Sequence, residues 1–171
     1  MTAKLIIGGK EFEIEILDPE LQETITSNKK TGYEIAELGE TYYYDNGFNA
    51  ILSDVKTNVY EDDLLRAIAN CYSSSDIARN NARADKLMRQ LRRFAVENRK
   101  TNINWDDEDQ AKYIITYRHR SNTLFPEDVY STQEFGAIYF DSAEAACFAI
   151  DTFHDDLIWY FTEYKDSLWG D

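Results

Sequence analysis

The longest periodic pattern of apolar and polar positions lies between Ser74 and Lys100. At 100° per residue, one face of this segment is apolar and the opposite face is basic, which is the period of an α-helix sustained for about six turns. The apolar face comprises Ile77, Ala84, Leu87, Met88, Leu91, Phe94 and Ala95. The basic face comprises Arg79, Arg83, Lys86, Arg89 and Arg93. Ser73, three residues before Asp76, resembles a capping box, and Ser74 and Ser75 are alternative caps. We expect this helix to carry the hydrophobic core.

A second helical pattern runs from about Ser142 to Lys165, again with one apolar side. That side comprises Ala146, Ala149, Ile150, Phe153, Leu157, Phe161 and Tyr164. Alternation and β-propensity predict strands at Glu40–Asp45, Phe48–Leu52, Lys112–Arg118 and Phe135–Phe140. Tyr60–Ala69 has the spacing of a short helix, but the residues that follow it are strand-like.

The first residues, Lys4–Leu17, alternate in a way that predicts a β-hairpin with Gly8-Gly9 as its turn. An isolated two-stranded hairpin is marginal in water, so its apolar side needs a partner surface. The main domain, a second copy or a target protein are all open as that partner. The polar segment 18–31 predicts a linker containing a short helix at 20–25, which leaves 32–171 as the main domain.

The starts of the two long helices resemble each other. Tyr72 and Phe140 each end a predicted strand, and each is followed two residues later by a serine and then by an acid suited to a first helical turn. Two strands followed by a helix, twice, predict an α+β fold. We expect a mainly antiparallel sheet with two long helices on one face, in addition to the N-terminal β-hairpin.

Charge changes this picture most. The chain of 171 residues has a net charge of −14, with 18 basic and 32 acidic residues. Residues 76–100 hold eight basic and three acidic residues, so the remainder holds ten basic and 29 acidic residues, a balance of −19. Such a surface repels nucleic acid and anionic membranes and attracts basic proteins. We therefore predict no membrane association and no direct nucleic-acid binding. We expect the basic helix face to pair with surplus acids on neighbouring elements rather than to track phosphates. The N-terminal residues lack the pattern of a secretory signal, which favours a cytoplasmic protein.

The sequence contains no recognisable catalytic, metal or cofactor motif. Cys71 and Cys147 stand apart, as expected of structural thiols. His119 and His154 have no nucleophile in their sequence context, and a solvated helix face explains His154 better than a metal site with Asp151 and Asp155 does. No glycine spacing fits a phosphate loop. We predict a non-enzyme with no cofactor and no bound metal.

Two acidic segments are the candidate partner-binding residues. They are Glu61, Asp62 and Asp63, and Asp106, Asp107, Glu108 and Asp109. The second segment lacks the alternating ligands, turn glycine and closing glutamate of a calcium loop. Each segment is the acidic cap of a helix N-terminus, a solvated surface, or a contact for arginines that normally hold phosphate.

Several short motifs are spread over about residues 32–164. They are Gly39-Glu40-Thr41-Tyr42-Tyr43-Tyr44, Asn70-Cys71-Tyr72, Leu91-Arg92-Arg93-Phe94-Ala95-Val96-Glu97-Asn98, Trp105, and Ile138-Tyr139-Phe140 followed by Ala146 and Ile150. Together they resemble a family of small proteins, mostly without assigned function, encoded by phages and prophages of Gram-positive bacteria. The family commonly has glycine where this chain has Ala69. The resemblance implies a phage origin and an accessory role, and it brings no catalytic residues.

Many such phage genes act against host defence, anti-CRISPR proteins among them. The resulting hypothesis is an inhibitor in the bacterial host cytoplasm that binds a host nucleic-acid-binding protein or nuclease and competes with nucleic acid through its acidic patches. The alternative is a phage structural or assembly protein that uses the N-terminal hairpin for oligomerisation or docking.

Overall fold

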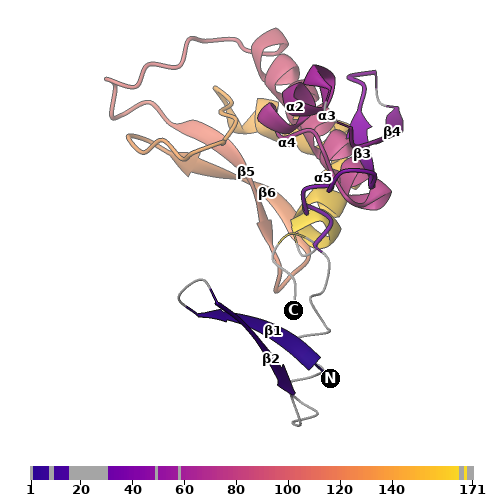
Figure 1. Ribbon diagram of the computed structural model, residues 1–171. Coiled ribbons are helices and arrows are strands. Elements are labelled where there is room, and N and C mark those ends of the chain that lie inside the picture. The colour runs from indigo at the N-terminus through magenta and orange to yellow at the C-terminus, as the bar shows by residue number, and fades with distance from the viewer. Residues whose placement is uncertain are drawn as a thin grey trace.

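A computed structural model of the chain describes residues 2–7, 10–15, 31–48, 50–57, 59–165 and 168. Its elements are β1 (Thr2–Ile7), β2 (Lys10–Glu15), β3 (Thr41–Asp45), β4 (Ile51–Val55), α2 (Tyr60–Ala67), α3 (Ser75–Glu97), β5 (Lys112–Arg118), β6 (Thr123–Val129), α4 (Ala143–Thr152), α5 (His154–Trp159) and the π-helical turn η1 (Tyr160–Tyr164) (Figure 1). This mixture of helices and small antiparallel sheets confirms the predicted α+β class. Within the described ranges, no helix has the length and apolar character needed to cross a membrane.

The strands pair two by two. β1 pairs with β2, β3 with β4 and β5 with β6, each antiparallel, in three separate two-stranded sheets. The expectation of one main sheet is therefore corrected.

The predicted hairpin turn at residues 8–9 and residues 18–30 of the predicted linker lie outside the described residues. Gly32, predicted as the start of the main domain, is buried at a φ of 86°, and a Cβ at this position would clash with the Ile77 side chain.

β4 begins three residues later than the predicted strand Phe48–Leu52. The reason is Asn46, whose side-chain Oδ1 accepts hydrogen bonds from the backbone N–H groups of Phe48 (2.8 Å) and Ala50 (3.3 Å). Asparagine side chains commonly hold turns in this way, so the connection between β3 and β4 extends to Ala50.

The predicted strand Phe135–Phe140 is wrong, and β6 was not predicted. Gly136 has a φ of 78°, and the N–H of Ala137 donates to the carbonyl of Glu134 over 3.3 Å, so the first part of this segment is a turn. Only Phe140 pairs with β5, in a single bridge to Tyr113. β6 contains Pro126, which argues against a central strand but is tolerated in a strand paired along one edge only.

Helix α3 matches the predicted central helix, and Ser74 is its N-terminal cap, accepting from the N–H of Ile77. The second predicted helix is not continuous. At Phe153 the backbone leaves the α-helical region, with φ −115° and ψ 21°, and separates α4 from α5. The Phe153 ring packs edge-on against Phe94 of α3 with 5.6 Å between ring centroids. The apolar periodicity did not predict this break in the helix. The break coincides with a tertiary contact between Phe153 and Phe94.

The two halves of the main domain repeat one arrangement. Tyr72 forms an isolated antiparallel bridge with Tyr43 of β3, and Phe140 forms the same kind of bridge with Tyr113 of β5. Each bridging residue stands two positions before a serine that caps a helix, Ser74 for α3 and Ser142 for α4. The two helix starts that resemble each other in sequence are therefore also preceded by the same kind of β-bridge.

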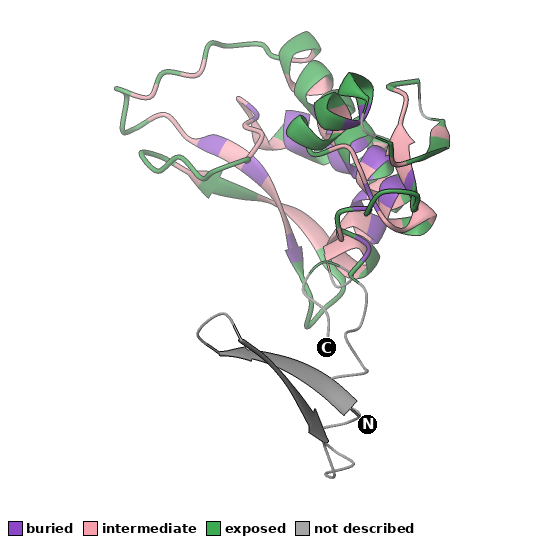
Figure 2. Cartoon of the chain, in the orientation of Figure 1, coloured by how far each residue is buried: buried purple, intermediate pink, exposed green. Residues whose placement is uncertain are grey.

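The core lies where α3 meets α4, α5 and the segment before α4. Its buried members are Leu87, Leu91, Phe140, Ala145, Ala146, Ala149, Ile150 and Leu157. Phe94 and Phe153 are partly buried against them, so residues of both predicted apolar helix faces meet in this core. Figure 2 shows buried positions along these helices and on β5, whereas the connecting loops are mostly exposed.

Candidate partner-binding site

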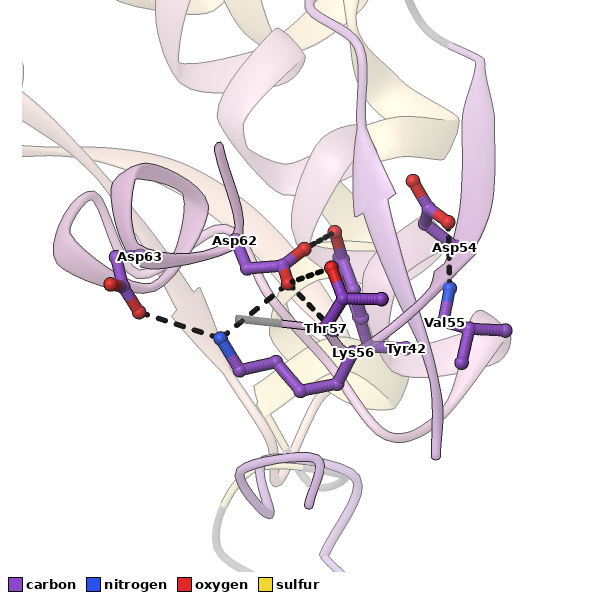
Figure 3. Close-up of polar contacts among 7 residues, drawn as sticks. All are labelled: Tyr42, Asp54, Val55, Lys56, Thr57, Asp62 and Asp63. Atoms are coloured by element: carbon purple, nitrogen blue, oxygen red, sulfur yellow. Dashed lines mark hydrogen bonds and ion pairs between the residues drawn. The ribbon is translucent and has the colours of Figure 1, made fainter. Parts of the chain in front are cut away.

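The first acidic segment forms the opening turn of α2, and Asp62 points inward from it. Only 5% of Asp62 is exposed. Its Oδ1 accepts a hydrogen bond of 2.8 Å from the Tyr42 hydroxyl, and its Oδ2 accepts from the N–H (2.7 Å) and the hydroxyl (3.1 Å) of Thr57 (Figure 3). Asp62 is the third residue of α2, a position from which a carboxylate reaches back to the chain before the helix. It holds the fold together and is not presented to a partner.

These contacts perturb the ionisation of both partners. The hydrogen bond from Tyr42 and those from Thr57 lower the pKa of Asp62, in opposition to its burial. Burial, together with the hydrogen bond to Asp62, raises the pKa of Tyr42. The pair therefore remains a carboxylate and a neutral phenol throughout the physiological range.

Lys56, in the loop before α2, forms ion pairs with the first turn of that helix. Its Nζ lies 3.6 Å from Asp62 Oδ2 and 3.4 Å from Asp63 Oδ1, so it partly neutralises both (Figure 3). Glu61 is exposed, and no ion pair of its carboxylate is found within the described part of the chain. Of the three acids predicted as contacts here, Glu61 and Asp63 face solvent and Asp62 does not.

All four residues of the second acidic segment are exposed. Asp106, Asp107, Glu108 and Asp109 lie on the loop between α3 and β5. Asp107 Oδ1 accepts from the N–H groups of Asp109 (3.0 Å) and Gln110 (3.2 Å), which closes a turn. Among the described residues, the carboxylates of Asp106, Glu108 and Asp109 have neither a hydrogen bond nor an ion pair. Three free carboxylates therefore lie within four residues.

The backbone of this loop is anchored by Lys112 of β5, a residue whose role sequence reasoning missed. Lys112 is fully buried, and its Nζ donates to the backbone carbonyls of Asp107 (2.7 Å) and Tyr130 (2.8 Å). The same ammonium lies 5.3 Å from the ring centroid of Trp105, which packs edge-on against Tyr139 at 4.8 Å. A buried lysine needs such partners, because an unpaired buried charge is costly. Lys112 thus anchors the backbone of the acidic loop, while the acidic side chains of the loop face water.

Three of the five residues on the basic face of α3 form ion pairs, but only Arg83 pairs with an acid on a neighbouring element, as was expected of the whole face. Arg83 contacts Asp156 of α5 at 2.7 Å and lies over the Trp159 ring. The other two pairs form within α3 itself, Arg79 with Asp76 and Arg93 with Glu97. Lys86 and Arg89 are exposed, with no ion pair inside the described ranges. Two such cations are a weak phosphate-binding surface on a chain of charge −14.

The histidines do not form a site. His119 packs edge-on against Tyr117, with 4.9 Å between ring centroids, and His154 Nδ1 lies 3.1 Å from the neighbouring Asp155. No group of three or more histidine, cysteine or acidic side chains in the described residues is arranged to hold a metal ion. Cys71 and Cys147 are free thiols.

Sequence reasoning also missed an apolar groove of about 620 Å³. It lies among α3, β5, η1 and the turn before Phe140, and its apolar wall includes Leu91, Ile115, Phe140 and Phe161. His119, Glu134 and Lys165 also line it. Nothing local in the sequence predicts the groove, because its walls come from four separate segments.

Comparison of the chain with protein-family models, curated proteins and solved structures gives no match. The resemblance to phage accessory proteins therefore stays a prediction.

Proposed function

We propose that this protein is a phage-encoded inhibitor that acts by binding rather than by catalysis, in the cytoplasm of the bacterial host. Its partner is a host nucleic-acid-binding protein or nuclease, and its acidic loop occupies part of the basic surface that nucleic acid uses. One observation carries the proposal: three unpaired carboxylates, on Asp106, Glu108 and Asp109, project from a loop whose backbone is anchored by Lys112.

Anchoring matters because a loop that is already ordered loses less conformational entropy when it binds. Carboxylates can pair with the arginines of a phosphate-binding surface, in bidentate geometry where the approach allows it. The charge of the rest of the chain strengthens long-range attraction to a basic partner and speeds association. Glu61 and Asp63 are secondary contacts in this proposal, while Asp62 keeps a structural role.

The test begins with capture of host proteins on the immobilised full-length chain, followed by binding measurements with the purified captured protein. The loop variant carries Asp106→Asn, Glu108→Gln and Asp109→Asn. The control variant carries Asp151→Asn, Asp155→Asn and Glu163→Gln, three exposed helical acids, so both variants lose the same formal charge. We expect the loop variant to associate more slowly and to show a flatter dependence of affinity on salt than the control.

Competition with nucleic acid gives a second readout. Single-stranded or duplex nucleic acid that the partner normally binds should release it from the immobilised chain. Equal affinity and equal salt slope for the two variants, with no release by nucleic acid, would overturn the proposal.

A second candidate function rests on the hairpin. β1 pairs with β2 in register from Thr2↔Glu15 to Ile7↔Lys10, and two strands alone need a covering surface. In this alternative the hairpin docks the protein into a phage assembly. Deletion of residues 1–30 should then abolish assembly, whereas inhibition through the acidic loop should survive that deletion.

A further inference from the structure

Phe135 is the most exposed large apolar side chain among the described residues, with a relative exposure of 109%. It stands at the second position of the turn formed by residues 134–137. The positive φ of Gly136, 78°, suits the third position of a type II turn. The N–H of Glu134 donates to the Tyr139 hydroxyl, and the N–H of Ala137 donates to the Glu134 carbonyl. Phe135 is therefore displayed by a hydrogen-bonded turn.

The apolar groove lies directly beside this turn, because Phe135 and Gly136 themselves form part of its lining. Its volume of about 620 Å³ is in the range that accepts several side chains or a drug-sized ligand. Tyr160 and Phe161 form one wall from the π-helical turn η1. Such turns recur at functional sites in proteins. A projecting aromatic ring and an apolar groove thus share one face.

The charges on this face are complementary. Glu134, next to Phe135, is exposed, and no ion pair of its carboxylate is found in the described residues. Lys165 lines the groove with its Nζ 4.9 Å from the Phe161 ring centroid, and no carboxylate partner is found for it in the same part of the chain. His119 lines the groove between the exposed Arg118 and Arg120. One face therefore presents the Glu134 carboxylate beside the ring and the Lys165 ammonium at the groove.

We propose that this face binds a second copy of the chain across a two-fold axis. Phe135 of each copy enters the groove of the other, and Glu134 of each copy approaches Lys165 of the other. A surface that holds both a projection and its complement is self-complementary, which is the condition for an isologous dimer. The exchange buries two fully exposed aromatic rings and forms two ion pairs.

Sedimentation velocity of the full-length chain over a wide range of protein concentration tests the proposal. We expect a monomer–dimer equilibrium in the unaltered protein. Phe135→Ser should weaken dimerisation by roughly 30-fold or more, as for other buried aromatic anchors. Phe48→Ser is the matched control, because Phe48 is 89% exposed and does not line the groove, and it should leave dimerisation unchanged. Both replacements lie at exposed positions, so circular dichroism should be unaltered.

Exchanging the charges of Glu134 and Lys165 tests whether these two residues meet across the two-fold axis. Glu134→Lys alone and Lys165→Glu alone should each weaken the dimer by like-charge repulsion, and the double variant should restore it. A monomer at every concentration, or a dimer unchanged by Phe135→Ser, would overturn the proposal. In the first case the groove belongs to a different occupant, and in the second the association uses another surface such as the hairpin.

Discussion

The hydroxyl of Tyr42 donates a 2.8 Å hydrogen bond to Asp62 Oδ1 and so joins β3 to the first turn of α2. Both residues are buried, with 2% and 5% exposure. Because of this contact, the two acidic segments have different roles. The segment at 61–63 has its middle carboxylate committed to the fold, whereas the segment at 106–109 keeps three carboxylates in water.

Tyr42→Phe should destabilise the protein by about 1–2 kcal/mol, because it leaves a buried carboxylate oxygen without its donor. In an Asp62→Ala background the same replacement should cost less, since the acceptor is already gone. Asp63→Ala is the exposed control and should lower the free energy of unfolding less than Asp62→Ala. Urea denaturation of the four variants and the unaltered chain measures these differences. A Tyr42→Phe cost that is the same in both backgrounds would contradict the coupling.

Lys112→Met should release the acidic loop. The replacement removes two charge-assisted hydrogen bonds to backbone carbonyls and should lower the free energy of unfolding by about 1.5–3 kcal/mol. Amide hydrogen exchange should speed up at residues 102–110 before it changes in α3. Lys86→Met, at an exposed position of α3, is the control and should alter neither measurement. Unchanged exchange in the loop of the Lys112→Met protein would show that other contacts hold it.

Glu34 should give the folded state an acid-sensitive contact. The Ser73 hydroxyl and the hydrogen bonds from Thr31 lower its pKa from 4.5 to about 2. Because the folded-state pKa is depressed, the stabilisation is fully present above pH 4.5 and is lost as the pH falls toward 2. Thermal unfolding from pH 6 to about 2 should therefore show a smaller decline in Tm for Glu34→Gln than for the unaltered chain. Parallel declines would exclude this contribution from Glu34.

Leu91→Ala tests the core between α3 and the C-terminal helices. Leu91 is 5% exposed and belongs to the main apolar cluster, so its truncation should cost about 2–5 kcal/mol. Val96→Ala, on the same helix but 66% exposed, should cost no more than about 0.5 kcal/mol. Denaturant titration of the two variants compares them directly. Similar losses for both would contradict the assignment of the buried face.

Features encoded in neighbouring residues were predictable from the sequence. The period of α3 identified the helix to within three residues at each end, and β5 occupies the predicted range Lys112–Arg118. Ser142 was recognisable at the start of α4, because a cap acts on N–H groups only two or three residues away. For α3 the sequence left three candidate serines; Ser74 is the cap, whereas the hydroxyl of Ser73, the capping-box candidate, donates to Glu34. The exposed loop at 106–109 was also visible, since four consecutive acids are rarely buried together.

Contacts between distant segments decided the rest. β6 pairs with β5 in spite of Pro126, because only one edge of the strand needs hydrogen bonds. Asp62 turns inward because Tyr42 and Thr57 supply donors, and Lys112 is buried because two carbonyls and the Trp105 ring receive its charge. The sequence determined which faces are apolar and where helices begin, since these depend on local period. Only the tertiary structure decided which polar groups find buried partners and where a groove remains open, because those outcomes depend on residues far apart in the chain.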